Sequence, residues 1–201
     1  MLNFFKDNTT KKTKITTIVT LLINILYSVG NFALGFAQSS FWFATMGAYF
    51  LVLSIMRLVC IKRFSNQSDG KSTKKFVGIM LIFLFLVLIG SIILSHQLDV
   101  ILPFHQIIMI SIATYTTLKI SVAIINIVKA HKSKNDNAIA LRNVSLADAT
   151  VSILSMQRSM LVTFGDMSTT TIKLFNLITG ASVCVFIFLL GLFLIIKSKN
   201  N

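Results

Sequence analysis

Hydrophobic residues in this chain gather in long stretches that are separated by short polar segments. Six such stretches cover roughly residues 15–37, 41–62, 76–95, 101–128, 144–165 and 172–196. Each is close to the roughly 20 residues that an α-helix needs to cross a hydrocarbon core, and the longest must tilt or protrude. The pattern predicts an all-α fold, a polytopic bundle of six transmembrane helices that forms a single integral membrane domain over residues 1–201.

Basic residues mark alternate connections between the stretches. They lie before the first (Lys6, Lys11, Lys12, Lys14), between the second and third (Lys62, Arg63, Lys71, Lys74, Lys75), between the fourth and fifth (Lys129, Lys132, Lys134, Arg142) and after the sixth (Lys197, Lys199). The other three connections, near 37–40, 96–100 and 166–171, contain no Lys or Arg. Because cytosolic loops are enriched in Lys and Arg, we expect three in-out-in hairpins in the cell membrane, with both termini in the cytosol and the basic segments against anionic lipid headgroups.

The composition supports the membrane class. The chain is 55% hydrophobic and 12% charged, whereas a soluble domain carries about 25% charged residues. The net charge of +13 could suggest a nucleic-acid partner. Such proteins gather their charge on a folded soluble surface, but here it lies in short clusters between apolar stretches. We therefore expect no nucleic-acid partner.

The first stretch has an alternative interpretation as a secretory signal peptide. A basic start precedes an apolar run that ends in the small residues of Gly35-Phe36-Ala37, as in cleaved leaders. However, the run is longer than a usual signal core and contains Asn24 and Asn31. We favour a first membrane span.

Motifs of enzymatic chemistry are scarce. The segment 65–72 ends like a P-loop, but Ser65 replaces the first glycine and no strand–helix context surrounds it. The sequence has no H-E-x-x-H motif and no Cys/His cluster at ligand spacing. We therefore expect no enzymatic activity, no metal site and no cofactor.

Polar residues inside the stretches are the candidate functional residues, because an ionisable group at bilayer depth is costly and usually faces a partner or water. Helical spacing places several of them on one face of the fourth stretch and several on one face of the fifth. The candidates are Tyr115, Lys119 and Asn126 in the fourth stretch, Asp148, Ser152 and Arg158 in the fifth, and Asn24 and Asn31 in the first.

Lys119 and Asp148 are the candidates for an ion pair. Lys119 precedes the basic cluster after the fourth stretch by about ten residues, or roughly 15 Å, and Asp148 follows Arg142 at a depth of roughly 9 Å. We hypothesise that the two pair between these spans. The pair would either fix helix register, with serines allowing close packing, or take part in transport. Arg57, near the inner end of the second stretch, is expected to extend to the headgroups.

Two segments of the chain carry a family resemblance. The run Asn31-Phe32-Ala33-Leu34-Gly35, followed by Ser40-Phe41-Trp42-Phe43, Tyr49 and Arg57, resembles the first half of a family of small six-span bacterial membrane proteins. The runs Ala123-Ile124-Ile125-Asn126-Ile127-Val128-Lys129 and Val151-Ser152-Ile153-Leu154-Ser155 resemble its second half. The resemblance implies a helical membrane scaffold and brings no assigned activity.

The span number and the inside termini are also similar to those of cation diffusion facilitators. The metal-binding His and Asp pairs of that family, in spans two and five, are missing. Span two has neither residue type, and span five has Asp148 alone. The similarity therefore implies the scaffold without its metal site.

These features favour a transporter-like or channel-like module for an unidentified small solute or ion. The alternative is a non-transporting membrane component, such as an accessory subunit, a regulator or an immunity-type protein. A transporter should need Asp148 or Lys119 for flux, whereas an accessory protein should co-purify with a larger partner. Assembly as a homo-oligomer or with a larger membrane partner stays open, as does a true repeat among the three hairpins.

The predicted topology can be tested by accessibility. A reporter fused after Asn201 and a single cysteine placed at Asn66 should both be unreachable from outside intact cells. Both positions lie beside basic clusters, which the positive-inside rule places in the cytosol. A membrane-impermeant thiol reagent checks the cysteine, and it should react once the cells are permeabilised. Labelling of either position in intact cells would contradict the topology.

Overall fold

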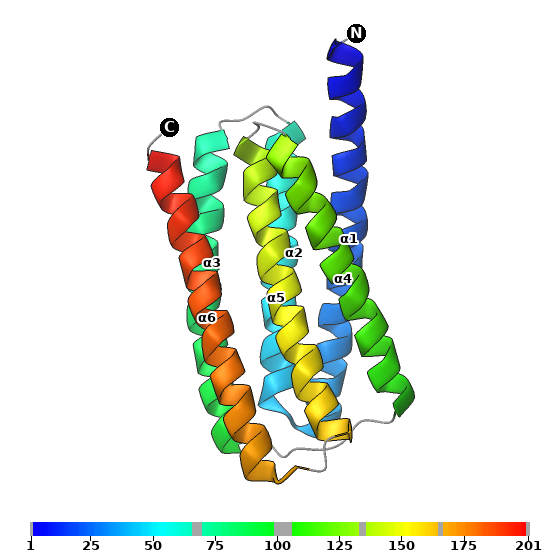
Figure 1. Cartoon of the computed structure of the whole chain (residues 1–201), viewed down its shortest axis with the longest axis vertical. Coiled ribbons are helices and arrows are strands. Elements are labelled where there is room, and N and C mark those ends of the chain that lie inside the picture. The colour runs from blue at the N-terminus through cyan, green and yellow to red at the C-terminus, as the bar shows by residue number, and fades with distance from the viewer. Residues whose placement is uncertain (1, 66–69, 99–105, 133–135, 165–166, 200–201) are drawn as a thin grey trace.

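A computed structural model of the chain describes residues 2–65, 70–98, 106–132, 136–164 and 167–199 and is a bundle of α-helices. The helices are α1 (Leu2–Gln38), α2 (Phe41–Ser65), α3 (Gly70–Leu98), α4 (Gln106–Lys132), α5 (Asp136–Phe164) and α6 (Thr169–Lys199). Successive helices run in opposite directions, and both ends of the chain lie at the same end of the bundle (Figure 1). The prediction of an all-helical bundle is confirmed.

Four helices are long and apolar enough to cross a membrane, and they indicate a membrane-embedded protein. Among the described residues, the qualifying segments are Thr17–Ala37, Phe41–Arg63, Gly70–Leu94 and Thr169–Lys199. In α4 the apolar segment is shorter, Met109–Ile125. The start of the expected fourth span, residues 101–105, lies outside the described residues. The spans of α4 and α5 therefore stay predictions from the sequence.

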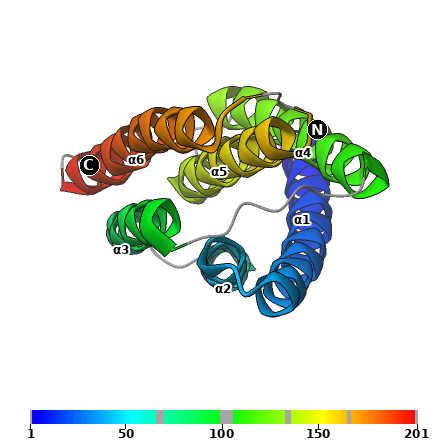
Figure 2. The same cartoon turned by 90° about the horizontal axis from the view of Figure 1, so that it is seen from below.

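The position of α5 explains why it is less apolar than the others. It packs against α2, α3, α4 and α6, and it lies among the other helices when the bundle is seen along its length (Figure 2). Its polar residues Ser145, Asp148, Ser152 and Ser155 are buried in these contacts. A helix that packs against four others needs less of the apolar surface that lipid requires.

The helices form two layers of three. Figure 2 shows α1, α2 and α3 in one layer and α4, α5 and α6 in the other. Neighbours pack within each layer, and α2 with α5 and α3 with α6 pack across them. α1 starts at the end of the bundle where α4 finishes (Figure 1). The first helix of one layer is therefore antiparallel to the first helix of the other, and the same holds for the second and third helices, so the two layers are oppositely directed.

The two layers are closest where α3 meets α6. A Cβ atom on Gly78 would lie 2.9 Å from the Gly191 carbonyl oxygen, and one on Gly191 would lie 3.1 Å from the Gly78 carbonyl oxygen. The lack of a side chain at both positions lets the two backbones approach, as small residues do in membrane helix pairs. This edge of the bundle is therefore tightly closed.

The opposite edge, between α1 and α4, is more open. Within the described part of the chain, α1 and α4 are not among the helix pairs with close backbone contact. They meet through side chains, since the rings of Tyr27 and Tyr115 stack with their centroids 4.5 Å apart. Large aromatic residues thus hold the layers apart here.

The turn between α1 and α2 forms where the sequence predicts a connection. Ser39 adopts a left-handed backbone conformation with φ of 50°, and the Ser40 N–H donates to the Gly35 carbonyl at 3.0 Å. This arrangement is a common way to end a helix. Gly35 also lets α2 approach, because a Cβ there would lie 2.8 Å from the Ala44 nitrogen.

Replacement of Gly78 by Ala should lower the free energy of unfolding by about 1–3 kcal/mol, because the new Cβ overlaps the backbone of α6. The matched control is Gly90→Ala, on the same helix, where no atom lies within 4 Å of the new Cβ. The control should be neutral or slightly stabilising. Thermal unfolding in detergent measures both, and equal effects of the two substitutions would contradict this account of the α3–α6 contact.

Candidate functional site

Asp148 on α5 is the centre of a buried polar network, with 2% of its surface exposed. Its Oδ1 accepts from the Lys119 Nζ at 2.7 Å. Its Oδ2 accepts from the Arg57 Nη2 at 2.8 Å and from the Asn24 Nδ2 at 2.9 Å. Helices α1, α2 and α4 thus each contribute one donor side chain to the carboxylate that α5 provides. We call these four residues the Asp148 cluster.

Two serines of α5 extend the cluster. Ser145 and Ser152 lie about one helical turn before and after Asp148 and therefore on its face. The Lys119 Nζ donates to the Ser152 Oγ at 3.0 Å, and the Arg57 Nη1 donates to the Ser145 Oγ at 3.4 Å. The polar face that the sequence predicts on α5 is therefore where both cations are held.

Aromatic rings surround the ammonium of Lys119. Its Nζ lies 4.0 Å from the ring centroid of Phe50, 5.0 Å from that of Tyr115 and 5.1 Å from that of Tyr27. A cation over an aromatic face is attracted by the ring quadrupole. These rings replace part of the hydration that Lys119 loses on burial.

The cluster has more positive than negative charge. Arg57 and Lys119 are 1% and 5% exposed, and one carboxylate serves both. The sequence contains no Glu, and its other Asp residues lie near the ends of the helices or in the connections: Asp7, Asp69, Asp99, Asp136 and Asp166. Even Asp136, which begins α5, is about 18 Å along the helix from Asp148. The net charge at the centre of the bundle is therefore positive.

The structure brings together several of the residues expected from the sequence. The pair hypothesised between Lys119 and Asp148 is present, with Asn24 and Ser152 as further members of the network. Tyr115 reaches its edge, since its hydroxyl lies 3.4 Å from the Asn24 Oδ1.

Two other candidates, Asn31 and Arg158, lie away from the cluster, and a third is not described. The Asn31 Nδ2 donates to the Tyr27 carbonyl at 2.7 Å, one turn away on α1. The guanidinium carbon of Arg158 lies 4.5 Å from the ring centroid of Trp42, more than two turns along α5 from Asp148. The side chain of Asn126 is outside the described residues.

The expectation for Arg57 was wrong. It does not extend to the headgroups, but turns inward and pairs with Asp148. Helical side chains point toward the start of their helix, which for α2 takes Arg57 away from the basic end. The sequence did contain a signal for this pair, which is the similar depth of the two residues. Arg57 lies about 7.5 Å before Lys62, and Asp148 lies about 9 Å past Arg142.

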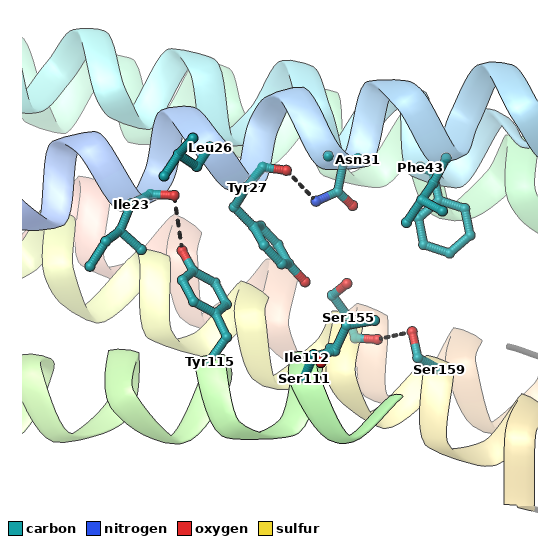
Figure 3. Close-up of a pocket in the computed structure, with 12 residues that line it drawn as sticks. Ile23, Leu26, Tyr27, Asn31, Phe43, Ser111, Ile112, Tyr115, Ser155 and Ser159 are labelled. Carbon is teal, nitrogen blue, oxygen red and sulfur yellow. Dashed lines mark hydrogen bonds between the residues drawn. The ribbon is translucent and has the colours of Figure 1, made fainter. Parts of the chain in front are cut away.

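Two cavities lie along the open α1–α4 edge. The larger, of about 410 Å³, is lined by Tyr27, Asn31, Ser111, Tyr115, Ser155 and Ser159 together with apolar residues, and we call it the Asn31 cavity (Figure 3). The smaller, of about 240 Å³, is lined by Val19, Thr20, Ile23, Tyr115, Leu118, Lys119 and Val122, and we call it the Lys119 cavity. Ile23 and Tyr115 border both cavities, and Tyr115 stacks on Tyr27, which lines the larger one.

Comparisons of the chain with protein-family models, with curated proteins and with solved structures find no match. Within the residues that the structure describes, no group of three or more His, Cys, Asp or Glu side chains is placed to hold a metal ion. The fold and the site together define a membrane-embedded helical bundle with a buried ion cluster at its centre.

The effect of a substitution in the cluster on stability should depend on the charge balance that it leaves. Asp148→Asn leaves two buried cations without a counter-charge and should cost about 3–5 kcal/mol of stability. Lys119→Met leaves the neutral Arg57–Asp148 pair and should cost less. In the double variant the Lys119 change should restore part of the loss, which a double-mutant cycle of thermal unfolding in detergent measures.

The matched control for this series is Lys173→Met, which removes one lysine in the first turns of α6, away from the cluster. It should leave the unfolding temperature unchanged. A cycle in which the Asp148 and Lys119 effects are simply additive would contradict the coupling.

Proposed function

We propose that the chain is a six-span, non-enzymatic, transporter-like membrane protein, with the Asp148 cluster as the site that meets a small solute or ion. One observation carries the proposal. The cluster is shared between the two oppositely directed layers, with Asn24 and Arg57 from one layer and Lys119 and Asp148 from the other. In many secondary transporters the solute site lies where two such halves meet.

The lengths of the helices support six spans. α4 and α5 have 27 and 29 residues, more than the roughly 20 that cross a hydrocarbon core. The last turns of α2 and α6 carry Lys62 and Arg63 and Lys197 and Lys199. This placement supports a cytosolic position for that end of the bundle, against anionic headgroups, with both termini on the same side.

The depth of the cluster supports a solute site rather than a surface site. Lys119 lies 13 residues from each end of α4, or about 20 Å by the helical rise. Ionisable residues near the bilayer centre line solute pathways in transporters and pumps. A solute site at this depth would need access that alternates between the two sides.

The two cavities support a path along the α1–α4 edge. The Lys119 cavity lies toward the end of the bundle that holds the termini, and the Asn31 cavity lies toward the other end. Ile23 and Tyr115 line both cavities, and Tyr115 stacks on Tyr27. Opening of this tyrosine pair would join the two cavities beside the Asp148 cluster.

The second candidate is a non-transporting membrane component, assembled with a larger membrane partner or as a homo-oligomer. It is favoured by the occupied carboxylate of Asp148, both of whose oxygens accept from buried donors, Lys119, Arg57 and Asn24. A buried ion network of this kind can serve to set the register of helices.

Water access separates the two candidates. In a chain whose buried free cysteines Cys60 and Cys184 are replaced by Ala, Ser111→Cys and Thr20→Cys should react with a small charged thiol reagent. Each lines one cavity, and water there allows the reactive thiolate to form. Ser111→Cys should react from outside and Thr20→Cys from the cytosolic side.

The matched control is Leu86→Cys, at an exposed apolar position of α3 that would face lipid. It should not react, because hydrocarbon does not support a thiolate. If the two cavity positions are as unreactive as this control, the cavities are dry and the non-transporting alternative is favoured.

A further inference from the structure

The Asp148 cluster contains two cations and one carboxylate, so one positive charge is not neutralised. The cluster also borders the Lys119 cavity. Arg57 and Lys119 share one carboxylate, and the other acidic residues of the sequence lie near the helix ends or in the connections. An unbalanced charge inside a bundle of low dielectric constant is costly. The rings around Lys119 offset part of that cost, but a cation–π contact is weaker than a full counter-charge.

Lys119 is the cation of the cluster that faces this space. It lines the cavity of about 240 Å³ between α1 and α4. An ammonium has three N–H donors, and Asp148 and Ser152 accept two of them at 2.7 Å and 3.0 Å. Within the described part of the chain, a third donor therefore remains for an acceptor that carries the missing negative charge.

The rest of the Lys119 cavity indicates the kind of anion. Its walls away from Lys119 are mostly apolar, with Val19, Ile23, Leu118 and Val122, and two lining residues, Thr20 and Tyr115, carry a hydroxyl. The volume is below the range of about 300–1,000 Å³ that holds drug-sized ligands. A small ligand with one charge and a short alkyl chain fits both the charge and the lining.

We infer that the Lys119 cavity binds a small organic monoanion, a short-chain carboxylate whose oxygens meet the Lys119 ammonium and whose alkyl part lies against Val19, Leu118 and Val122. The inference deepens the proposed function, since this ligand would be the solute. A monocation would meet two like charges in the cluster. Chloride would balance the charge but would leave the apolar walls unfilled.

Ligand-dependent unfolding of the purified full chain, held in nanodiscs of a zwitterionic lipid, tests the site. Butyrate should raise the unfolding temperature in a saturable manner, because a ligand that binds only the folded state stabilises it. Butanol and butylamine, of the same chain length without the negative charge, should have no saturable effect. Chloride should bind at least tenfold more weakly than butyrate.

Variants locate the binding. Lys119→Met should weaken butyrate binding at least tenfold, and Lys119→Arg should largely retain it. Val122→Phe fills the cavity without changing its charge and should also weaken binding, so the test survives if Lys119→Met fails to fold. Lys173→Met, far from the cavity on α6, should bind as the unchanged chain does.

Several results would overturn the inference. Equal stabilisation by butanol and butyrate would remove the role of charge, and equal binding of chloride would remove that of the alkyl chain. Unchanged binding in both Lys119→Met and Val122→Phe would place the ligand elsewhere. Stabilisation by phosphatidylglycerol in the nanodisc but not by butyrate would identify the occupant as a lipid.

Failure of this inference and failure of the proposed function give different results. If butyrate does not bind but both cavity cysteines react with the thiol reagent, the pathway stands and the ligand class is wrong. If butyrate binds at Lys119 but no labelled butyrate crosses a liposome that contains the protein, the site stands and the transport function is wrong.

Discussion

The meeting of three donors at the carboxylate of Asp148 is the interaction on which the centre of this molecule depends. Asn24, Arg57 and Lys119 come from three different helices and reach the same two oxygen atoms. A charged hydrogen bond inside a membrane bundle tolerates little displacement, because each partner that loses its contact stays buried and uncompensated. One side chain of α5 therefore sets the relative register of α1, α2, α4 and α5.

Residue size then decides where the bundle has room. Gly78 and Gly191 bring α3 and α6 into backbone contact, whereas Tyr27 and Tyr115 keep α1 and α4 apart. The space left beside the tyrosines is bordered by Lys119, the cation that the aromatic rings partly shield. Packing at one edge and charge at the centre thus combine to leave a cavity of positive character at the other edge.

Hydropathy and charge order along the chain were enough to predict the helices, the α1–α2 turn and the Lys119–Asp148 pair, because depth along a helix follows from residue counting. They did not predict which helices are neighbours. The inward turn of Arg57 and the contact from Asn24 depend on α2 and α1 lying beside α5, and apolar stretches carry no such information. The low apolarity of α5 could not be explained from the sequence either, since only the fold shows that α5 packs against four other helices.

The contact between Gly78 and Gly191 has a mechanical consequence. Two layers that touch backbone to backbone along one edge, and through side chains along the other, can rotate against each other most easily about the tight edge. A given angle of rotation about that edge displaces α1 from α4 further than it displaces α2 from α5, because the α1–α4 edge is further from the axis. The largest displacement in such a rotation falls at Tyr27 and Tyr115. The contact of Gly78 with Gly191 therefore affects how far the two tyrosine rings can separate on the opposite side of the bundle.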